Sequence, residues 1–215
     1  LQMFSPVVVV PSTAPADVFS AARAVQHLDV IARAPRPVGS PGHAETRAYL
    51  IQQLEALGLS PQTQDTVSAF RFPGAEDFGV ASVRNVMVRL PGTAGHDAVL
   101  LSGHYDGGST APAAGDCGAC VIALLEVLRG LRIGPPLAHD VIAIFTDAEE
   151  VGDLGAHAFA TQHPWMQDVR VALNFEVMGN TGPASLYVTG PGNGRLIAAF
   201  ARHAPGALSS SFDVG

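Results

Sequence analysis

The chain has 215 residues, of which 47% are hydrophobic and only 14% charged, a composition that excludes intrinsic disorder. Its 19 acidic and 12 basic residues give a formal net charge of −7 without a basic stripe, so neither nucleic acid nor an anionic membrane surface is expected as its main partner. All 12 basic residues are arginine, which excludes mechanisms that need a lysine, such as a P-loop or a Schiff base.

The first sixteen residues carry no charge, and we expect them to form an extended lead or linker, 1–16, ahead of a single domain over 17–215. The chain begins with Leu1 and not with Met, so this lead either follows a removed signal or membrane anchor or is a plain N-terminal strand or linker. The first alternative places the protein outside the cytoplasm, secreted or anchored upstream of Leu1, and that is the location we expect. No uninterrupted apolar run approaches the roughly 18 residues of a membrane span.

Apolar residues at helical spacing predict an amphipathic helix over Ala14–Ala34, which a segment rich in proline and glycine then ends. A second helix is expected from about Ala44 to Leu57. Two segments rich in β-forming residues, Thr63–Phe72 and Ala81–Leu90, predict a pair of strands.

The second half of the chain alternates strands with helices. Further strands are expected over Ala98–Ser102, Asp140–Thr146, Val169–Phe175 and Ser185–Thr189, and helices over Asp116–Leu131 and Gly194–His203. Ala98–Ser102 is a continuous apolar run, which predicts burial on both faces, and we expect the next two strands to be buried as well. The alternation predicts an α/β sandwich, in which functional residues gather at the carboxyl ends of the central strands.

Potential metal ligands follow the three buried strands. They are His104 and Asp106 after the first, Glu149 and Glu150 after the second, Glu176 after the third, and Asp116 at the start of the helix between the first two. A cluster of carboxylates at the rim of an apolar sheet repels itself and needs a cation to balance it. Imidazole together with carboxylates favours zinc or a similar divalent ion.

The segments that carry these residues resemble the successive motifs of the di-zinc exopeptidases, the family of bacterial leucine aminopeptidase and glutamate carboxypeptidase. They are Leu101–Asp106 (LSGHYD), Ala114–Glu126 (AGDCGACVIALLE), Phe145–Ala156 (FTDAEEVGDLGA) and Asn174–Gly179 (NFEVMG). The last motif is most similar to the endoplasmic-reticulum metallopeptidase branch of the family. The resemblance implies a three-layer α/β/α sandwich with a mixed, largely parallel central sheet that lacks its C-terminal strands.

The resemblance also implies a role for each candidate ligand. Asp116 would bridge two zinc ions, His104 and Glu176 would complete one site, and Glu150 would belong to the other. The family supplies a final histidine that no residue here matches, and His203, the last histidine of the chain, falls in a predicted helix. We therefore expect a C-terminally truncated catalytic domain whose second zinc site is incomplete, and this piece would be inactive without that ligand.

Glu149 would be the general base, and Asp106 would orient the His104 ring. The spacing agrees with these roles. His104 and Asp106 are two residues apart on an extended segment, so their side chains leave the same face. Neighbouring Glu149 and Glu150 point in different directions, which lets one bind metal while the other faces the water.

Cys117 departs from the family pattern, which places a second aspartate directly after the bridging one. Its thiol could bind a zinc ion, or it could be a small buried residue at a helix start. Two cysteines, Cys117 and Cys120, are too few for a structural zinc site or a disulfide framework, and they leave the redox compartment undecided.

Together these motifs predict a zinc-dependent exopeptidase, most similar to an aminopeptidase, that acts on peptide substrates. A hydroxide bridging two Zn²⁺ ions would attack the N-terminal peptide bond. Two alternatives remain open. One is a single-zinc acyltransferase of the glutaminyl cyclase kind, which shares the fold, and the other is a catalytically inactive ectodomain that keeps the fold for binding.

Overall fold

The computed structural model describes residues 8–71, 74, 76–177, 185–204 and 207–209. The chain divides into two compact units: the larger runs from Val9 to Met178, and the smaller combines Leu1–Val8 with Gly179–Gly215. All six candidate site residues lie in the larger unit. The expected division into a lead and one domain at residue 16 stays a prediction. No helix among the described residues combines the length and the apolar character that crossing a membrane requires.

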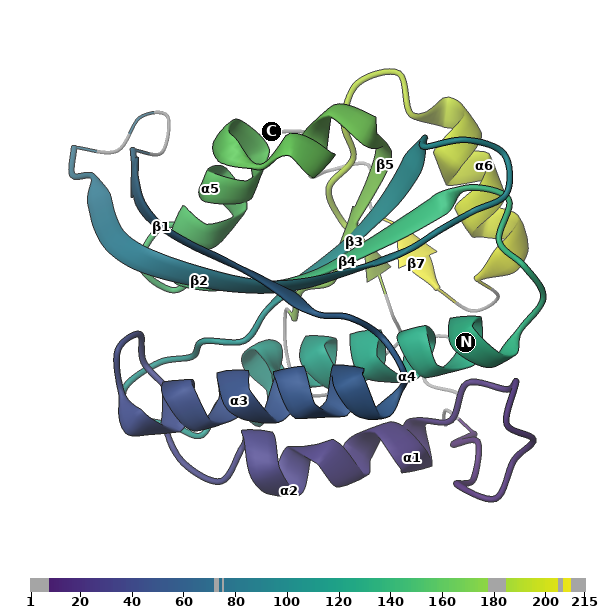
Figure 1. Cartoon of the computed structure of the whole chain (residues 1–215), viewed down its shortest axis with the longest axis horizontal. Helices are drawn as coiled ribbons and strands as arrows, with labels where there is room; N and C mark the ends of the chain where they lie inside the picture. The colour runs from purple at the N-terminus through teal and green to yellow at the C-terminus, as the bar shows by residue number, and fades with distance from the viewer. Residues whose placement is uncertain (1–7, 72–73, 75, 178–184, 205–206, 210–215) are drawn as a thin grey trace. The chain divides into compact units, whose positions relative to one another are not determined.

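A mixed five-stranded sheet forms the centre of the larger unit (Figure 1). Its strands are β1 (Gln62–Phe70), β2 (Gly79–Leu90), β3 (Ala98–His104), β4 (Asp140–Thr146) and β5 (Val169–Asn174). Their order in space is β1-β2-β4-β3-β5. Strand β2 pairs antiparallel with β1 and β4, whereas β3 runs parallel to both β4 and β5. The carboxyl ends of β3, β4 and β5 therefore meet at one edge of the sheet.

Helices cover both faces of this sheet (Figure 1). One side carries α3 (Pro41–Ala56) and α4 (Cys120–Ile133), with α1 (Ala21–Ala24) and α2 (Leu28–Ile31) beyond them, and the other side carries α5 (Leu154–Gln162). Short 3-10 turns lie at Val25–His27 and Pro164–Asp168. The three-layer architecture that the motifs predict is confirmed.

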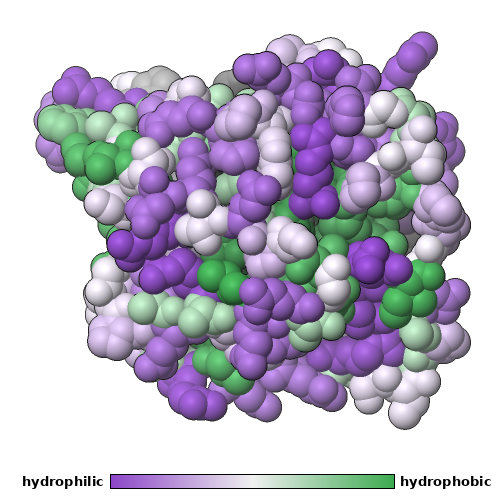
Figure 2. Space-filling view, in the orientation of Figure 1, coloured by the Kyte–Doolittle hydropathy of each residue, from purple (hydrophilic) through white to green (hydrophobic). Residues whose placement is uncertain are grey.

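Apolar side chains gather in the layers between helices and sheet. In the main cluster, Leu50 and Leu54 of α3 and Leu124 and Leu128 of α4 pack with Val86 of β2, and all are buried. Burial of such side chains is the principal force that holds the layers together. On the face shown in Figure 2, hydrophilic side chains cover most of the surface and apolar side chains appear in separate patches.

Burial differs between the central strands and the edge of the sheet. All seven residues of β4 are buried, because helices cover both of its faces. The same burial is expected for Val169–Phe175, and this prediction is wrong: most side chains of β5 are exposed. Strand β5 lies at the edge of the described sheet and carries the polar residues Arg170 and Asn174, which accounts for its exposure.

The first helix is shorter than its periodicity predicts. Helical structure runs over 21–31 instead of 14–34, and it begins behind Ser20, whose hydroxyl accepts a hydrogen bond from the backbone amide of Arg23. The guanidinium of Arg23 donates to four carbonyl oxygens between residues 12 and 18. Because a side chain already donates hydrogen bonds to those carbonyls, they do not need the backbone amides that a helix would provide.

Helix α3 starts at Pro41 and not at Ala44 as predicted. Ser40 caps it, since the Ser40 hydroxyl accepts a hydrogen bond from the His43 amide, and a proline suits the first turn.

Helix α4 starts later than Asp116, where the sequence places it. Asp116 and Cys117 have non-helical backbone angles within an irregular turn, Ala114–Ala119, and the regular helix begins at Cys120. This irregular turn separates the candidate ligand from the helix that packs on the sheet.

The smaller unit holds α6 (Gly194–His203), as the sequence predicts, and a parallel pair of two-residue strands, β6 (Ser185–Leu186) and β7 (Leu208–Ser209). The strand predicted over Ser185–Thr189 is therefore shorter than expected. Residues 178–179 of the last family motif lie outside the described residues.

Candidate metal centre

The candidate ligands meet where β3, β4 and β5 end. In the register of the sheet His104 pairs with Thr146, and Ser102 pairs with Asn174. The loop after Thr146 carries Glu149, and Glu176 follows Asn174 two residues later. Parallel pairing thus brings together residues that are distant in the sequence, at the edge where α/β proteins commonly place function.

The imidazole of His104 lies at the centre of the group. Its Nε2 atom is 3.0 Å from Asp116 Oδ1, 3.7 Å from Glu149 Oε2 and 3.8 Å from Glu176 Oε2. His104 is buried, Glu149 and Glu176 are half-buried, and Asp116 is exposed. A single buried ring therefore faces three carboxylates.

This donor set fits a zinc ion. One ligand atom from each of His104, Asp116, Cys117 and Glu176 lies within 4.8 Å of all the others. Ligand atoms that surround a tetrahedral zinc ion at its usual bond lengths are separated by roughly 3.3–3.8 Å, so a small contraction would close the group around one ion. Nitrogen and carboxylate oxygen are ordinary zinc donors.

The electrostatics of the group also call for a cation. Burial favours the neutral form of His104, but the carboxylates of Asp106, Glu176 and Glu149 outweigh it and raise the pKa of the imidazole to about 11. Burial, together with the charges of Asp153, Glu176 and Asp106, raises the pKa of Glu149 to about 7. The cluster thus favours protonated groups because protons reduce its negative charge, and a divalent ion would reduce that charge in the same way.

Asp106 connects the imidazole to the loop that carries the two glutamates. Its buried carboxylate accepts hydrogen bonds from the backbone amides of Glu149, at 3.1 Å, and Glu150, at 3.2 Å. Its Oδ1 atom lies 3.4 Å from Nδ1 of His104, and among the described residues this Nδ1 is a buried polar atom without a hydrogen-bond partner. Asp106 is therefore placed to orient both the ring and the loop.

Glu150 lies at the rim of the site and outside the tight group. Its side chain is exposed, and within the described ranges no group of three candidate ligands includes it. Burial of part of the carboxyl, with the nearby charge of Asp116, raises the pKa of Glu150. The part that the resemblance assigns to it in a second zinc site stays a prediction. His203, at the end of α6, belongs to the smaller unit.

A cavity of about 300 Å³ opens beside the cluster. It is lined by Ser102, His104, Thr146, Glu149, Asp153, Ala156, Asn174 and Glu176. Sequence reasoning missed Asp153, which directly precedes α5 and lies four residues after Glu149. Burial, along with the charges of Glu176 and Asp106, raises the pKa of its carboxyl. The turn that brings it to Glu149, in which the Asp153 amide donates a hydrogen bond of 3.0 Å to the Glu149 carbonyl, lies outside the helix, so helical spacing does not predict it.

Buried polar residues behind the cavity hold the glutamate loop. The carboxylate of Asp147 lies 2.8 Å from His43 Nε2 and accepts a hydrogen bond from the Arg84 backbone amide at 2.7 Å. Asn85 accepts from the Asp147 amide and donates to the Gly155 carbonyl. His43 thus supports the site from behind, and the ligand group found among the described residues does not include it.

The two cysteines form a disulfide, Cys117–Cys120, directly after Asp116. The sequence leaves Cys117 as either a ligand or a small buried residue; it is fully buried, and it is also bonded to Cys120. A pairing across three residues at a helix start is a common arrangement of redox-active cysteines, and spacing could have suggested it here.

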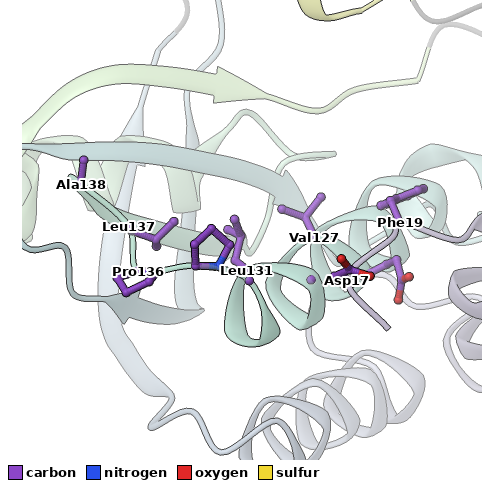
Figure 3. Close-up of a pocket in the computed structure, with 11 residues that line it drawn as sticks. Asp17, Phe19, Val127, Leu131, Pro136, Leu137 and Ala138 are labelled. Carbon is purple, nitrogen blue, oxygen red and sulfur yellow. The ribbon is translucent and has the colours of Figure 1, made fainter. Parts of the chain in front are cut away.

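A second hollow, of about 510 Å³, lies near the opposite ends of the strands (Figure 3). Its walls come from α4, from the connection into β4 and from the N-terminal segment, and include Val127, Leu131, Pro136, Leu137, Ala138, Asp17 and Phe19. Most of these side chains are apolar. The chemistry-bearing residues line the smaller cavity.

Comparison with known proteins gives three findings. The model of "Peptidase family M28" matches residues 85–214. Endoplasmic reticulum metallopeptidase 1 of Mus musculus is 30% identical over 196 residues, which cover 85% of this chain and 22% of that protein. The chain therefore spans about a fifth of the length of the curated relative it matches.

Among solved structures, glutaminyl cyclase of Porphyromonas gingivalis superposes with a TM-score of 0.64 at 24% identity, over 80% of this chain and 64% of that one. A leucine aminopeptidase precursor of Bacteroides thetaiotaomicron gives 0.66 at 19% identity, over 84% and 69%. At such identity the likeness shows a shared fold.

Proposed function

The chain belongs to peptidase family M28, and on this premise we propose that it carries the zinc centre of an exopeptidase that removes residues from the N-terminus of peptides. One observation carries the proposal: ligand atoms of His104, Asp116 and Glu176 converge within 4.8 Å, beside the carboxylate of Glu149. Zinc would be held by these three residues, and Glu150 would hold a second ion. When bound, zinc supplies Lewis-acid polarisation of a carbonyl and lowers the pKa of water.

Glu149 is the general base of this proposal. Its carboxylate faces the cavity, 3.7 Å from the His104 ring, so it can accept and return a proton beside the proposed zinc ligands. Glu149 Oε2 would take a proton from the attacking water and pass it to the leaving amine. Asp106 would keep the loop in place, because it holds the Glu149 amide.

The charge of the cavity supports an aminopeptidase. Glu149 and Asp153, which are not assigned to zinc, line it with their carboxylates beside the proposed ligand Glu176, and no arginine is found among its described lining residues. A protonated substrate amine would be attracted to such a wall, whereas a free C-terminal carboxylate would be repelled. The substrate amine would therefore enter the cavity first.

A glutaminyl cyclase-like acyltransferase is the second candidate. Two observations favour it: the fold is shared with glutaminyl cyclase, and the described residues form one tight ligand group and not two. This candidate also accepts a free N-terminal amine, so only the product separates it from the peptidase.

The test uses the protein that contains this chain, assayed on dipeptides with free or acetylated N-termini, with and without a chelator. Chelator-sensitive release of amino acid from only the free peptides supports the proposal. Cleavage of acetylated peptides would contradict the proposed aminopeptidase activity and indicate a carboxypeptidase. Cyclisation of N-terminal glutamine without release of an amino acid would establish the acyltransferase, and zinc binding without either product would favour an inactive binding domain.

We propose an extracytoplasmic location, because the matched relative is named for the endoplasmic reticulum and because disulfides such as Cys117–Cys120 persist in oxidising compartments. We further propose that peptides, and not nucleic acid or anionic membrane surfaces, are its partners, given the net charge of −7. Protection of the tagged protein from protease added to intact cells or closed vesicles, and its loss on lysis, would test the location.

A further inference from the structure

The sulfur of Cys117 takes part in two arrangements that exclude each other. It is bonded to Cys120, with the two Cα atoms 5.1 Å apart. It is also one of the four donor atoms, with those of His104, Asp116 and Glu176, that lie within 4.8 Å of one another. A sulfur in a disulfide is no longer a thiolate, and the thiolate is the form that binds zinc.

We propose that Cys117 is a zinc ligand whenever the Cys117–Cys120 pair is reduced, and that the disulfide removes this ligand from the site. The proposal rests on the proposed function in one respect, the presence of zinc at this cluster. It goes beyond that function because it makes the ligand count of the site depend on its redox state.

Ligand count decides what the site can do. With His104, Asp116 and Glu176 alone, zinc has three protein ligands, the number found in catalytic sites, and one position stays open. Adding Cys117 makes four, the number found in closed structural sites. The disulfide form is therefore the open, catalytic state, and the dithiol form stores zinc without admitting substrate to it.

The two cysteines have different parts in this change. Cys117 lies against the site, and its sulfur approaches the Phe175 carbonyl oxygen at 3.8 Å. Cys120 is buried at the start of α4, and although its sulfur is bonded to that of Cys117, it belongs to no ligand group among the described residues. Cys117 thus supplies the sulfur that would bind the metal, and disulfide formation with Cys120 makes that sulfur unable to bind it.

The redox step balances with an external reductant. A trialkylphosphine reduces the S–S bond to two thiols. The phosphine supplies two electrons and becomes the phosphine oxide, and one water supplies the oxygen of that oxide and the two protons of the thiols. Binding of zinc then replaces the proton on the Cys117 sulfur, and that proton leaves to solvent. In the reverse direction an external disulfide accepts the two electrons and is reduced to two thiols.

Zinc binding and disulfide formation must also disfavour each other by the same factor. If reduction increases zinc affinity by some factor, linkage requires that zinc favours the reduced pair by the same factor. The effect should be at least about tenfold, because removal of even an outer-shell partner of a metal ligand costs 10–100-fold in affinity.

The experiment compares the wild type with Cys117→Ser and Cys120→Ser, each loaded with Co²⁺ in place of zinc and treated with or without a phosphine that contributes no sulfur. We expect a sulfur-to-cobalt charge-transfer band in the reduced wild type and in reduced Cys120→Ser. The oxidised wild type and Cys117→Ser in either state should lack it. A chelator competition should show tighter zinc binding after reduction of the wild type, and no such change for Cys117→Ser.

Reduced wild-type protein needs no substitution, so a folding defect in a variant cannot hide the answer. Bound Co²⁺ without a sulfur band in both reduced wild type and reduced Cys120→Ser would overturn the inference and leave the proposed zinc centre standing. Absence of any bound metal in either redox state would overturn the zinc centre itself.

Discussion

The side chain of Arg36 donates a hydrogen bond of 2.8 Å from Nε to the carbonyl oxygen of Tyr105, 69 residues further along the chain. Its other nitrogens donate to the carbonyls of Pro112 and Ala113. Arg36 is fully buried and so clamps both ends of the segment that joins His104 to the turn carrying Asp116.

Arg36→Lys should loosen this clamp. A lysine keeps the charge but loses the fork that reaches several carbonyls, so we expect a loss of about 2 kcal/mol in the free energy of unfolding and weaker zinc binding. Urea unfolding and chelator competition would measure the two effects. Arg170→Lys, on an exposed pair with Asp97, is the control and should change neither. Equal behaviour of the two variants would show that the clamp is not needed.

Glu149→Gln should abolish peptidase activity while zinc binding persists. Loss of a general base typically costs 10²–10⁴-fold in rate, and we expect a decrease in kcat of about that size. The measurement pairs steady-state kinetics with metal content. Glu55→Gln, on the exposed side of α3, is the matched control. A variant that kept full activity would remove Glu149 from its proposed role.

Removal of zinc should destabilise the protein as well as inactivate it. Three candidate ligands converge from β3, from the turn before α4 and from beyond β5, so an ion bound to them would link these elements. At a free zinc concentration about 100 times its Kd, binding to the native state alone adds about 2.7 kcal/mol to the stability. Thermal unfolding with chelator and with added zinc would check this, and an unchanged Tm would contradict it.

Gly155→Ala should displace the glutamate loop. A Cβ at this position would overlap the Asp147 carbonyl oxygen and Oδ1 of Asn85, and backbone there cannot yield as a flexible side chain would. We expect a loss of about 1–3 kcal/mol in stability and a large loss of activity. Gly130→Ala, in α4 with open space around the added Cβ, should be neutral or stabilising. Similar losses for both would argue against a local effect.

Ionised Glu126 should contribute to the free energy of unfolding, and acidification should remove this contribution. Burial opposes its ionisation, but Arg129, the Ser20 amide and Arg23 lower the pKa of its carboxyl below the usual 4.5. The ionised form therefore stabilises the native state fully above about pH 4.5, and this contribution is lost as the pH falls through the lowered folded pKa.

Glu126→Gln should accordingly cost about 3 kcal/mol at neutral pH, because it leaves two arginines with a weakened partner in a buried network. The difference from the wild type should shrink on acidification. Urea titrations at several pH values would show this narrowing, with exposed Glu45→Gln as the control. A difference that stayed constant down to low pH would mean that charge is not the cause.

Some elements could be predicted from the sequence because local pattern alone determines them. Strand β4 has the predicted bounds, since an uninterrupted apolar run needs cover on both faces. Helix α6 also has its predicted bounds, Gly194–His203. The start of the first helix could not be predicted in this way, because it depends on arginine contacts with carbonyls, including those that Arg129 makes from more than a hundred residues away.

The candidate site shows the same division. His104, Asp116, Glu149 and Glu176 are brought together by parallel strand pairing, which strand-end positions predict. The spacing of Cys117 and Cys120 is compatible with their disulfide, whereas the support of the loop by Asp147 depends on side-chain geometry that no spacing rule specifies. The roles that the resemblance assigns to these four residues, to Asp106 and to Glu150 stay predictions.

The pairing of β3 with β5 has a consequence for the order of folding. Ser102 donates a hydrogen bond to Asn174 across 72 residues of sequence, and both residues line the same cavity as the candidate ligands His104 and Glu176. Closing so long a loop is slow compared with forming local helices, because its entropy must be lost before any contact repays it. A growing or partly folded chain thus cannot assemble His104 with Glu176 until β5 has docked. Acquisition of zinc with the native ligands would then mark a late kinetic event, and its rate would report the completion of this sheet.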